Sequence, residues 1–488
     1  MSTIATPSGQ PLGTDAGAGQ GSQPDAAPVP RGRRRTELLM LVFVVGVVLL
    51  AYANVGLGLN GKIPAGLFEY GLAFAVLVGA AHMAVRWLAP YADPLLLPLA
   101  ALLNGLGIVM IYRLQEAGRG GNGGFVITTM STSTTALQVF YTAIGMAAFV
   151  AVLAFIRQPR TLQRYTYTLG AIGLVLVALP AVLPASISQV PGTAAKIQIA
   201  LPGIGSVQPE EFAKLALAVF FAGYLVAKRD VLALAGRHVL GIDLPRARDL
   251  GPVLIAWGVS LVVLVFEGDV GTSALFFGLF VVMMYVATQR SSWLIIGFLL
   301  FISGSLIASQ LFAHVRERFV IWLHPFNYVH TFSFQLVQGL YGLGFGGVLG
   351  RGLGQGQPYN TPLVQNDLII TAFGEELGLT GLMALLLIYG LIVQRGLRAA
   401  IAARDPFSKL LAGGLSFVVA LQVFVIVGGV TRLIPLTGIT TPFLSQGGSS
   451  LIASWMGIAL LMRISDTARR PAPQPIQDEG MTQVVRAG

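Results

Sequence analysis

The sequence predicts an all-α protein that crosses a membrane many times. Of its 488 residues, 55% are hydrophobic and only 11% are charged, whereas soluble proteins carry about 25% charged residues. Apolar runs of about 20 residues, the length of a membrane-crossing helix, recur along almost the whole chain. These two observations predict about twelve transmembrane helices. The expected spans are residues 38–58, 66–88, 94–113, 136–157, 167–184, 211–228, 250–266, 271–288, 292–312, 368–394, 410–430 and 447–464.

The composition also excludes several kinds of site. The chain contains no cysteine, which excludes disulfides and thiolate metal sites. Its formal net charge is +10. In a membrane protein such an excess belongs to cytoplasmic loops beside the membrane lipids, so we expect no nucleic acid as a partner.

The chain is expected to form one transmembrane domain between two tails. Residues 1–35 predict a disordered cytoplasmic tail, because residues 1–30 are rich in Gly, Pro, Ala and Ser and contain no Lys or Arg. A cluster of four arginines that starts at Arg31 then marks the cytoplasmic side of a retained first span, and no cleavable signal peptide is expected. The transmembrane domain covers residues 36–465, and residues 466–488 form a second cytoplasmic tail.

The distribution of positive charge sets the expected orientation. With the amino terminus inside, the inner segments hold 22 Lys and Arg and the outer segments hold 8, and Lys214 inside a span completes the 31. The positive-inside rule then places both termini in the cytoplasm. Four motifs with acidic or Gly/Ser residues all fall on the outer side, which predicts one site that opens outward. The outer connections are residues 114–135, 185–210, 313–367 and 431–446.

The outer loop 313–367, between spans nine and ten, is about 55 residues long and therefore too long for a structureless connection. Its Gly-rich middle, residues 335–356, predicts a surface or re-entrant helix followed by turns. The glycines suit either a phosphate cradle or close helix packing. Arg316 and Arg318 either anchor the loop to lipid headgroups or bind an anionic substrate such as a pyrophosphate.

Three acids lie at the start of the tenth span. Asp367 directly precedes the apolar run, which suits either a helix N-cap or a general base at the outer face. Glu375 and Glu376 follow about 12–14 Å deeper at the rise of a helix. Carboxylates at that depth are costly in lipid, so we expect both to line a cavity or to pair with a cation.

Further polar groups fall on the same outer side. Glu210 and Glu211 precede Lys214 by four and three residues, so either acid can pair with the lysine on one helix face. This is either a structural ion pair or part of a wet, substrate-binding interior. Asp269 follows the seventh span and Ser449 opens the last one, and ordinary cap and turn chemistry is the alternative for both.

Taken together, these motifs resemble those of the SEDS family, the RodA/FtsW polytopic glycosyltransferases of bacterial cell-wall synthesis. The resemblance covers roughly residues 190–465, and its strings follow the order of the family. They are Gln208-Pro209 through Glu211 and Lys214; Asp269-Val270-Gly271-Thr272; Arg316-Glu317-Arg318; Gly346-Gly347 through Gly354; Asn366-Asp367 with Glu375-Glu376-Leu377-Gly378; and Leu433-Ile434-Pro435 through Gly447-Gly448-Ser449-Ser450.

Two features refine the resemblance. The extra N-terminal spans, the phrase at 91–98 and the pattern at 428–432 are most similar to the actinobacterial RodA branch of the family. The chain departs from the family where Glu210 replaces Ser or Ala, which leaves the partner of Lys214 open. It also has Gln198 in place of Trp, and Asn366-Asp367-Leu368 in place of Thr-Asp-Phe.

The resemblance implies a ten-helix core with two added N-terminal spans, and an inverting peptidoglycan glycosyltransferase that polymerises lipid II for cell elongation and shape. Asp367 corresponds to the acid thought to act as general base on the acceptor hydroxyl. The remaining residues would bind substrate or line the cavity beneath Asp367. They are Arg316, Arg318, Glu211, Lys214, Asp269, Glu375, Glu376 and Ser449.

The resemblance also implies a place and a partner. The enzyme would act at the outer face of the bacterial cytoplasmic (inner) membrane and would need a class B penicillin-binding protein for cross-linking, because no transpeptidase domain is present. It leaves room for a divalent cation, Mg²⁺ or Mn²⁺, whose ligands the sequence does not identify.

Three other functions stay open from the residues alone. A lipid II flippase or another transporter also uses buried carboxylates, but it needs them near the midplane, with access from both sides. An FtsW-type division polymerase would share every motif. A scaffold of a cell-wall complex would tolerate replacement of Asp367.

Overall fold

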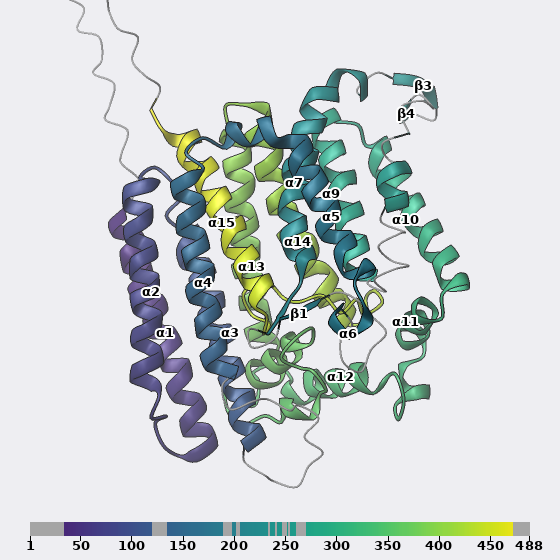
Figure 1. Ribbon diagram of the computed structural model, residues 1–488. Helices are drawn as coiled ribbons and strands as arrows, with labels where there is room; N and C mark the ends of the chain where they lie inside the picture. The colour runs from purple at the N-terminus through teal and green to yellow at the C-terminus, as the bar shows by residue number, and fades with distance from the viewer. Residues whose placement is uncertain are drawn as a thin grey trace, which may run out of the picture.

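The computed structural model describes residues 34–119, 134–188, 198–201, 205–232, 235–239, 242–245, 251, 254–259 and 270–471. Within these ranges the chain forms a bundle of long helices (Figure 1), and each of them coincides with an expected span. The long helices are α1 (Arg34–Asn60), α2 (Leu67–Leu88), α3 (Leu96–Arg119), α4 (Thr134–Phe155), α5 (Thr166–Val182), α7 (Pro209–Leu232), α9 (Val270–Thr288), α10 (Ser292–Leu311), α13 (Ile369–Ala402), α14 (Pro406–Val430) and α15 (Gly448–Arg469).

Ten of the described helices are long and apolar enough to cross a membrane. The helix α7, which carries charged residues at both of its ends, is not among them. The all-α, multi-pass class is confirmed. The count of twelve stays a prediction, because more than half of the expected span 250–266 and most of both tails lie outside the described residues. At the carboxyl end α15 continues to Arg469, past the expected domain boundary at 465.

Short elements connect the long helices. A 3-10 turn, η1 (Pro159–Tyr165), precedes α5, and a short helix, α6 (Ala185–Ser188), follows it. Strand β1 (Ile199–Leu201) pairs antiparallel with β2 (Gly205–Val207) just before α7, and β3 (Ala235–Val239) pairs with β4 (Ile242–Pro245) after it. The outer loop contains α11 (Ala313–Leu323), η3 (Pro325–Tyr328), α12 (Phe334–Gly346) and η4 (Pro358–Asn360). A helix followed by turns is thus confirmed for residues 335–356.

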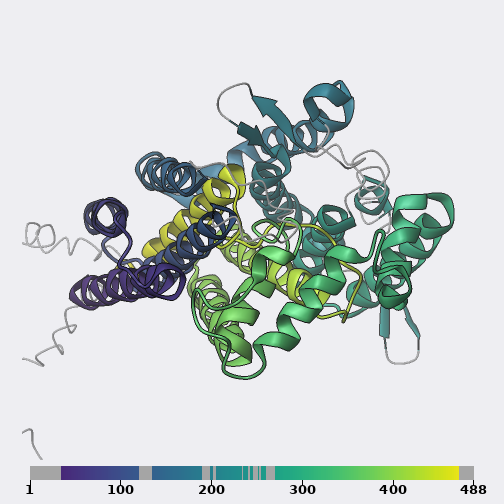
Figure 2. The ribbon, with the colours of Figure 1, turned by 90° about the horizontal axis from the view of Figure 1, so that it is seen from below.

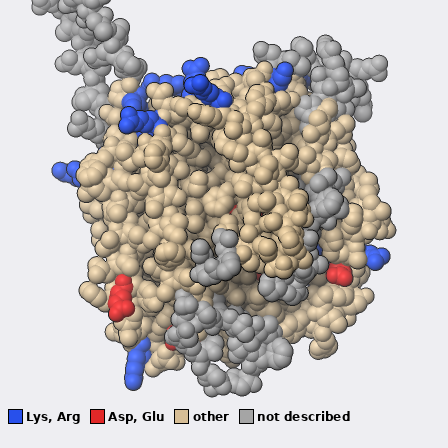
Figure 3. Space-filling model, in the orientation of Figure 1, with Lys and Arg blue, Asp and Glu red and all other residues tan. Residues whose placement is uncertain are grey.

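Both ends of the described chain lie at one end of the bundle (Figure 1). Arg34 donates to the carbonyls of Ala89 at 2.6 Å and Ala92 at 3.1 Å, and the next residue, Asp93, forms an ion pair with Arg469. Most of the Lys and Arg visible in Figure 3 lie along this upper edge. Figure 2 looks onto the opposite end, with the green segments of the outer loop in front of the bundle.

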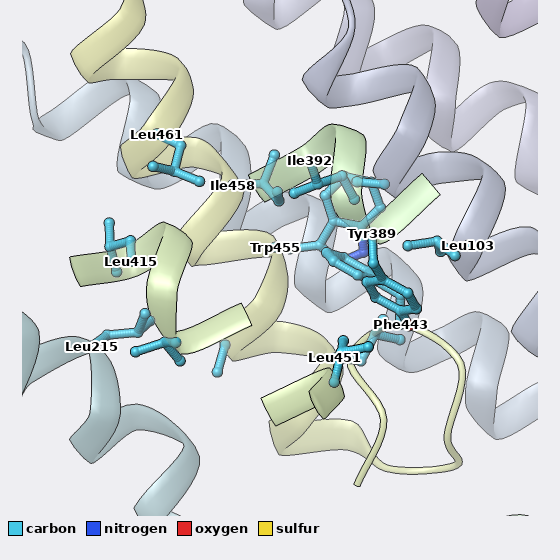
Figure 4. Close-up of a cluster of buried hydrophobic side chains, with 14 of the residues drawn as sticks. Leu103, Leu215, Tyr389, Ile392, Leu415, Phe443, Leu451, Trp455, Ile458 and Leu461 are labelled. Carbon is cyan, nitrogen blue, oxygen red and sulfur yellow. The ribbon is translucent and has the colours of Figure 1, made fainter. Parts of the chain in front are cut away.

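The core is centred on Trp455 of α15, which is fully buried (Figure 4). Its ring lies edge-on to Phe443 at a centroid distance of 5.3 Å, and its indole N–H donates to Asn104 Oδ1 at 3.0 Å. Nearby, the hydroxyl of Tyr389 donates to the carbonyl of Pro442. These contacts satisfy the polar tips of large buried aromatics and fix the loop before α15 to the middle of the bundle.

The helix α13 is broken at Gly378, where φ is 69° and ψ is −171°. Such a break removes two i→i−4 hydrogen bonds and leaves two carbonyls and two N–H groups to be satisfied elsewhere. The Gly-rich segment 347–352 supplies all four partners. Leu379 N–H donates to Gly347 O at 2.9 Å and Thr380 N–H to Val348 O at 3.1 Å, while Glu375 O accepts from Arg351 N–H at 3.0 Å and Glu376 O from Gly352 N–H at 2.8 Å.

We expect Gly378→Ala to destabilise the protein. A Cβ at this position would lie 2.2 Å from the backbone nitrogen of Gly350, and a backbone at φ 69° and ψ −171° costs an L-residue about 1–3 kcal/mol. Thermal unfolding in detergent should therefore show a clear drop in Tm. The matched control is Gly390→Ala in the same helix, where a Cβ meets no atom within 4 Å. Equal Tm values for the two variants would contradict this account of the kink.

Candidate active site

Asp367 lies between η4 and α13, at the end of the bundle that the sequence predicts to be the outer one, and its side chain is partly exposed. Gln335 Nε2 on α12 donates to Asp367 Oδ1 and to the carbonyl of Pro362, both at 3.2 Å. The helix α13 begins at Ile369, with Leu368 in the N-cap position and no side-chain cap. The alternative that Asp367 serves as the N-cap is therefore wrong, and its carboxylate is held from another helix.

The protonation of Asp367 depends on two opposing effects. Burial raises the pKa of its carboxyl, because the charged form loses solvation. The positive charge of Arg318 on α11 lowers that pKa, as do hydrogen bonds from the backbone of Asp367, from Gln335 and from the backbone of Leu368, but the upward shift prevails. A carboxylate with a raised pKa is a stronger base than an ordinary aspartate.

The two arginines of α11 have different surroundings. Arg318 is half-buried, and its Nη1 donates to the carbonyl of Leu436 at 3.1 Å. Its guanidinium is thereby held near Asp367, on which it acts electrostatically. The side chain of Arg316 is exposed and forms no ion pair with any described residue. Arg318 is thus a positioned charge, whereas Arg316 is free to contact a ligand or the membrane surface.

The segment that carries Asp367 is tied to the loop before α15. Gln446 N–H donates to the carbonyl of Gln365 at 2.8 Å, and the Ser445 hydroxyl donates to the carbonyl of Asn366. One non-glycine residue in each segment has a positive φ, Leu363 at 50° and Phe443 at 66°. Such conformations persist only where surrounding contacts impose them. The contact between the Asp367 segment and the loop before α15 is therefore a fixed part of the site.

A second polar cluster lies where α7, α14 and α15 meet. Lys214 forms an ion pair with Glu211, and its Nζ donates to Gln422 Oε1 at 3.1 Å. Gln422 Nε2 donates in turn to the carbonyl of Thr440 at 2.8 Å. Glu210 is also buried. The structure thus confirms the ion pair and assigns Glu211 to it; binding of substrate by Glu211 and Lys214 stays a prediction.

Ser449 connects the same cluster to the strand before α7. Its hydroxyl oxygen accepts from Gln208 N–H at 3.0 Å, and the adjacent Ser450 accepts from the Thr440 hydroxyl at 2.9 Å. Ser449 therefore has a structural bond, which leaves its substrate role a prediction. Asp269 lies outside the described residues.

Glu375 and Glu376 both have partners inside the protein. Glu376 is fully buried and accepts from Arg113 Nε at 2.7 Å, while Arg113 Nη2 donates to the carbonyl of Gly356 at 2.7 Å. Glu375 accepts from Gln357 N–H at 2.5 Å. Pairing with a cation is thus confirmed for Glu376. A role of either acid in substrate binding stays a prediction.

Three residues of this arrangement escaped the sequence analysis. Gln335 and Gln422 give no signal, because a lone Gln in an apolar run has no distinctive spacing. The expected span 94–113 places Arg113 at its outer end, whereas the structure buries this arginine within α3. A carboxylate inside a span, such as Glu376, calls for a cation on another span, but the expected position of Arg113 is too shallow to identify it as that partner.

Comparisons with known proteins identify the family of the chain. The family described as cell cycle protein, which groups FtsW, RodA and SpoVE, matches residues 94–470. The chain belongs to this family. The match includes α3 to α15 and leaves the α1–α2 hairpin outside. This agrees with the expectation that two N-terminal spans are added to the family core.

Relatives narrow the position within the family. The chain is 50% identical over 444 residues to the protein named peptidoglycan glycosyltransferase RodA of Mycobacterium tuberculosis, covering 91% of this chain and 92% of the relative. It is 48% identical, with the same coverage, to the protein of that name from Mycobacterium leprae. A probable peptidoglycan glycosyltransferase FtsW from a Geobacter species is 30% identical and aligns with 78% of this chain and 98% of its own length.

Solved structures share the fold. Rod shape determining protein RodA of Thermus thermophilus superimposes with a TM-score of 0.52 at 22% identity, covering 78% of this chain and 98% of that one. A chain from a study titled as structural coordination of polymerization and crosslinking by a peptidoglycan synthase complex gives a TM-score of 0.50 at 22% identity, covering 82% and 98%.

We expect the Arg113–Glu376 pair to be strongly coupled in a double-mutant cycle. Arg113→Met or Glu376→Gln alone leaves a buried partner uncompensated, which costs about 3–5 kcal/mol. The double variant removes both charges and should recover part of that loss. Thermal unfolding of the four proteins measures the coupling; strictly additive losses would show that the two side chains do not stabilise each other.

Proposed function

We propose that this chain is a peptidoglycan glycosyltransferase that polymerises lipid II at the outer face of the cytoplasmic membrane, for cell elongation and shape. The observation that carries the proposal is the placement of Asp367. Its carboxylate is held by Gln335, lies under the influence of Arg318 and remains partly exposed at the outer end of the bundle. The 50% identity to proteins named peptidoglycan glycosyltransferase RodA supports this activity and favours RodA over the FtsW type.

Asp367 acts as the general base in this proposal. Its carboxylate takes the proton of the acceptor sugar hydroxyl while the hydroxyl oxygen attacks the anomeric carbon of the donor. The bond between that carbon and the pyrophosphate oxygen breaks, the lipid pyrophosphate leaves and the configuration inverts. The hydrogen bond from Gln335 fixes the orientation of the carboxylate, so the carboxylate needs little reorientation before it takes the proton.

The arginines of α11 serve the leaving group. Developing negative charge on a pyrophosphate is stabilised by fixed cations, and a guanidinium can bind two phosphate oxygens at once. Arg316 offers an exposed guanidinium for this purpose. Arg318 already donates to the carbonyl of Leu436, so in this proposal it acts mainly through its electrostatic effect on Asp367.

A divalent cation, Mg²⁺ or Mn²⁺, remains a proposal. Within the described residues no group of three or more His, Cys, Asp or Glu side chains could hold a metal ion. An Mg²⁺ ion usually takes one or two carboxylates together with substrate phosphates and water. The described residues do not form a protein-only site, and no step above is routed through a metal.

The proposed setting is the bacterial inner membrane. The end of the bundle that carries Arg34 and Arg469 also gathers Lys and Arg (Figure 3), which supports a cytoplasmic position for both termini. Cross-linking then requires a class B penicillin-binding protein as partner. The likeness to a chain from a peptidoglycan synthase complex supports such an assembly.

We expect Asp367→Asn to lose glycan polymerisation. Loss of a general base costs about 10²–10⁴-fold in rate, so purified variant supplied with lipid II and a class B penicillin-binding protein should form at least 100-fold less polymer per unit time. An unchanged Tm controls for folding, because Asn can still accept from Gln335. Polymer at the wild-type rate would sink both the catalytic assignment and the proposed mechanism.

We expect Arg318→Gln and Arg316→Gln to affect the enzyme differently. Removal of the Arg318 charge raises the pKa of Asp367 further, so the pH at which activity falls on the acid side should move up. Arg316→Gln should leave the acid side of the pH profile unchanged and should raise the apparent KM for the donor. Rate profiles against pH and donor concentration measure both effects; identical profiles for the two variants would contradict the distinction.

A further inference from the structure

The outer loop contains an open cleft that the mechanism above does not use. Its volume is about 570 Å³, and its walls are formed by η3, the turn that follows it and the first half of α12. Cavities of about 300–1,000 Å³ hold small organic ligands, a range that includes a disaccharide.

The walls of the cleft are ordered. The N–H groups of Thr331 and Ser333 both donate to the carbonyl of Tyr328, at 3.0 and 3.3 Å. Behind the cleft, Trp322 Nε1 donates to the carbonyl of Arg432 at 3.0 Å, and Arg432 Nη2 donates to the carbonyl of Trp322 at 3.1 Å. The cleft is thereby attached to the connection between α14 and α15, which also supports the segment of Asp367.

The side chains of the cleft suit a neutral sugar. Phe326 and Tyr341 are each 54% exposed, so both rings have surface available for stacking. Tyr328, which is 41% exposed, already stacks on Phe332 at a centroid distance of 4.7 Å. The side-chain amides of Asn327 and Gln338 hydrogen-bond to no described residue. A pyranose ring presents apolar C–H faces to aromatic rings, and its hydroxyl and acetamido groups can bond to amides.

The scarcity of charge favours a sugar over other ligands. None of the residues that line the cleft is Lys, Arg, Asp or Glu, although His330 belongs to the lining and the guanidinium of Arg432 lies 5.9 Å from the ring centroid of Phe326. A lipid headgroup or a pyrophosphate would call for cations at this position. An aromatic belt at the membrane interface would explain the rings, but it would not explain free amides between them.

The cleft also adjoins the reacting groups. Gln338 lies three residues after Gln335 on α12, which is about one helical turn and places both on neighbouring positions of one face. Gln335 is the residue that donates to Asp367. A saccharide whose terminal unit reacts at Asp367 therefore has its next units within reach of the cleft.

We propose that this cleft binds N-acetylated sugar units of the growing glycan strand beside Asp367, an inference that rests on the proposed glycosyltransferase function. Tyr341 and Phe326 stack on the sugar rings, and Asn327 and Gln338 bond to their substituents. Binding at this position keeps the product strand on the enzyme between additions, so the cleft sets strand length rather than the rate of bond formation.

Strand length provides the first test. Full-length Tyr341→Ala and Gln338→Ala variants, assayed with lipid II and a class B penicillin-binding protein, should form strands at least about threefold shorter while lipid II consumption changes less than about twofold. Tyr341→Trp should restore the length. The matched control is Phe345→Ala, whose ring is 48% exposed on the same helix but does not line the cleft. Unchanged strand length in both cleft variants, or equal shortening in the control, would overturn the proposal.

Direct binding provides the second test and separates the two hypotheses. An oligomer of N-acetylglucosamine, titrated calorimetrically into the full-length Asp367→Asn protein, should bind, and Tyr341→Ala in that background should weaken binding at least about tenfold. No binding, or equal binding by both proteins, would refute the cleft even if polymerisation depends on Asp367. Conversely, Asp367→Asn active at the wild-type rate would refute the proposed function, and the titration would still decide the cleft. If Tyr341→Ala fails to fold, Gln338→Ala takes its place.

Discussion

A break in a membrane helix leaves backbone groups that only the protein itself can satisfy, and the outer half of this structure depends on one such break in α13. The kink at Gly378 is bonded to the segment 347–352, which folds back over it. The short piece of α13 before the kink is then fixed on a second side by the Glu376–Arg113 pair. Asp367 stands at the outer end of this piece. The Asp367 carboxylate, although it belongs to a loop, is thus attached to a rigid segment of helix.

The kink also accounts for the many glycines of the outer loop. Both Gly350 and Gly378 have a positive φ, and a Cβ on Gly350 would lie 2.3 Å from the carbonyl oxygen of Glu376. The backbones of the loop and of α13 approach too closely for side chains. Close packing, one of the two interpretations of these glycines, is therefore what the structure supports, and a phosphate cradle is not needed to explain them.

The sequence could predict those parts of the molecule that depend on local pattern. Apolar runs of membrane length located every long helix of the described chain, and the juxtaposition of Asp367 with an apolar run pointed to the candidate site. Contacts between segments that are distant in the chain could not be predicted from the sequence. The hydrogen bond from Gln335 to Asp367 joins residues 32 apart, and the Arg113–Glu376 pair joins residues 263 apart. The N-cap alternative failed for the same reason, because a tertiary partner took the carboxylate.

The α1–α2 hairpin packs on one flank of α3, whose Arg113 is paired with Glu376. A guanidinium on a helix that faces acyl chains is costly, but the membrane-length window of α3 is 83% buried, and Arg113 is 1% exposed. The family match begins at residue 94, so a chain made of that region alone would present this flank to lipid. The hairpin therefore shields one flank of α3 from the acyl chains, and a chain that lacked it would need a different residue pattern on that flank.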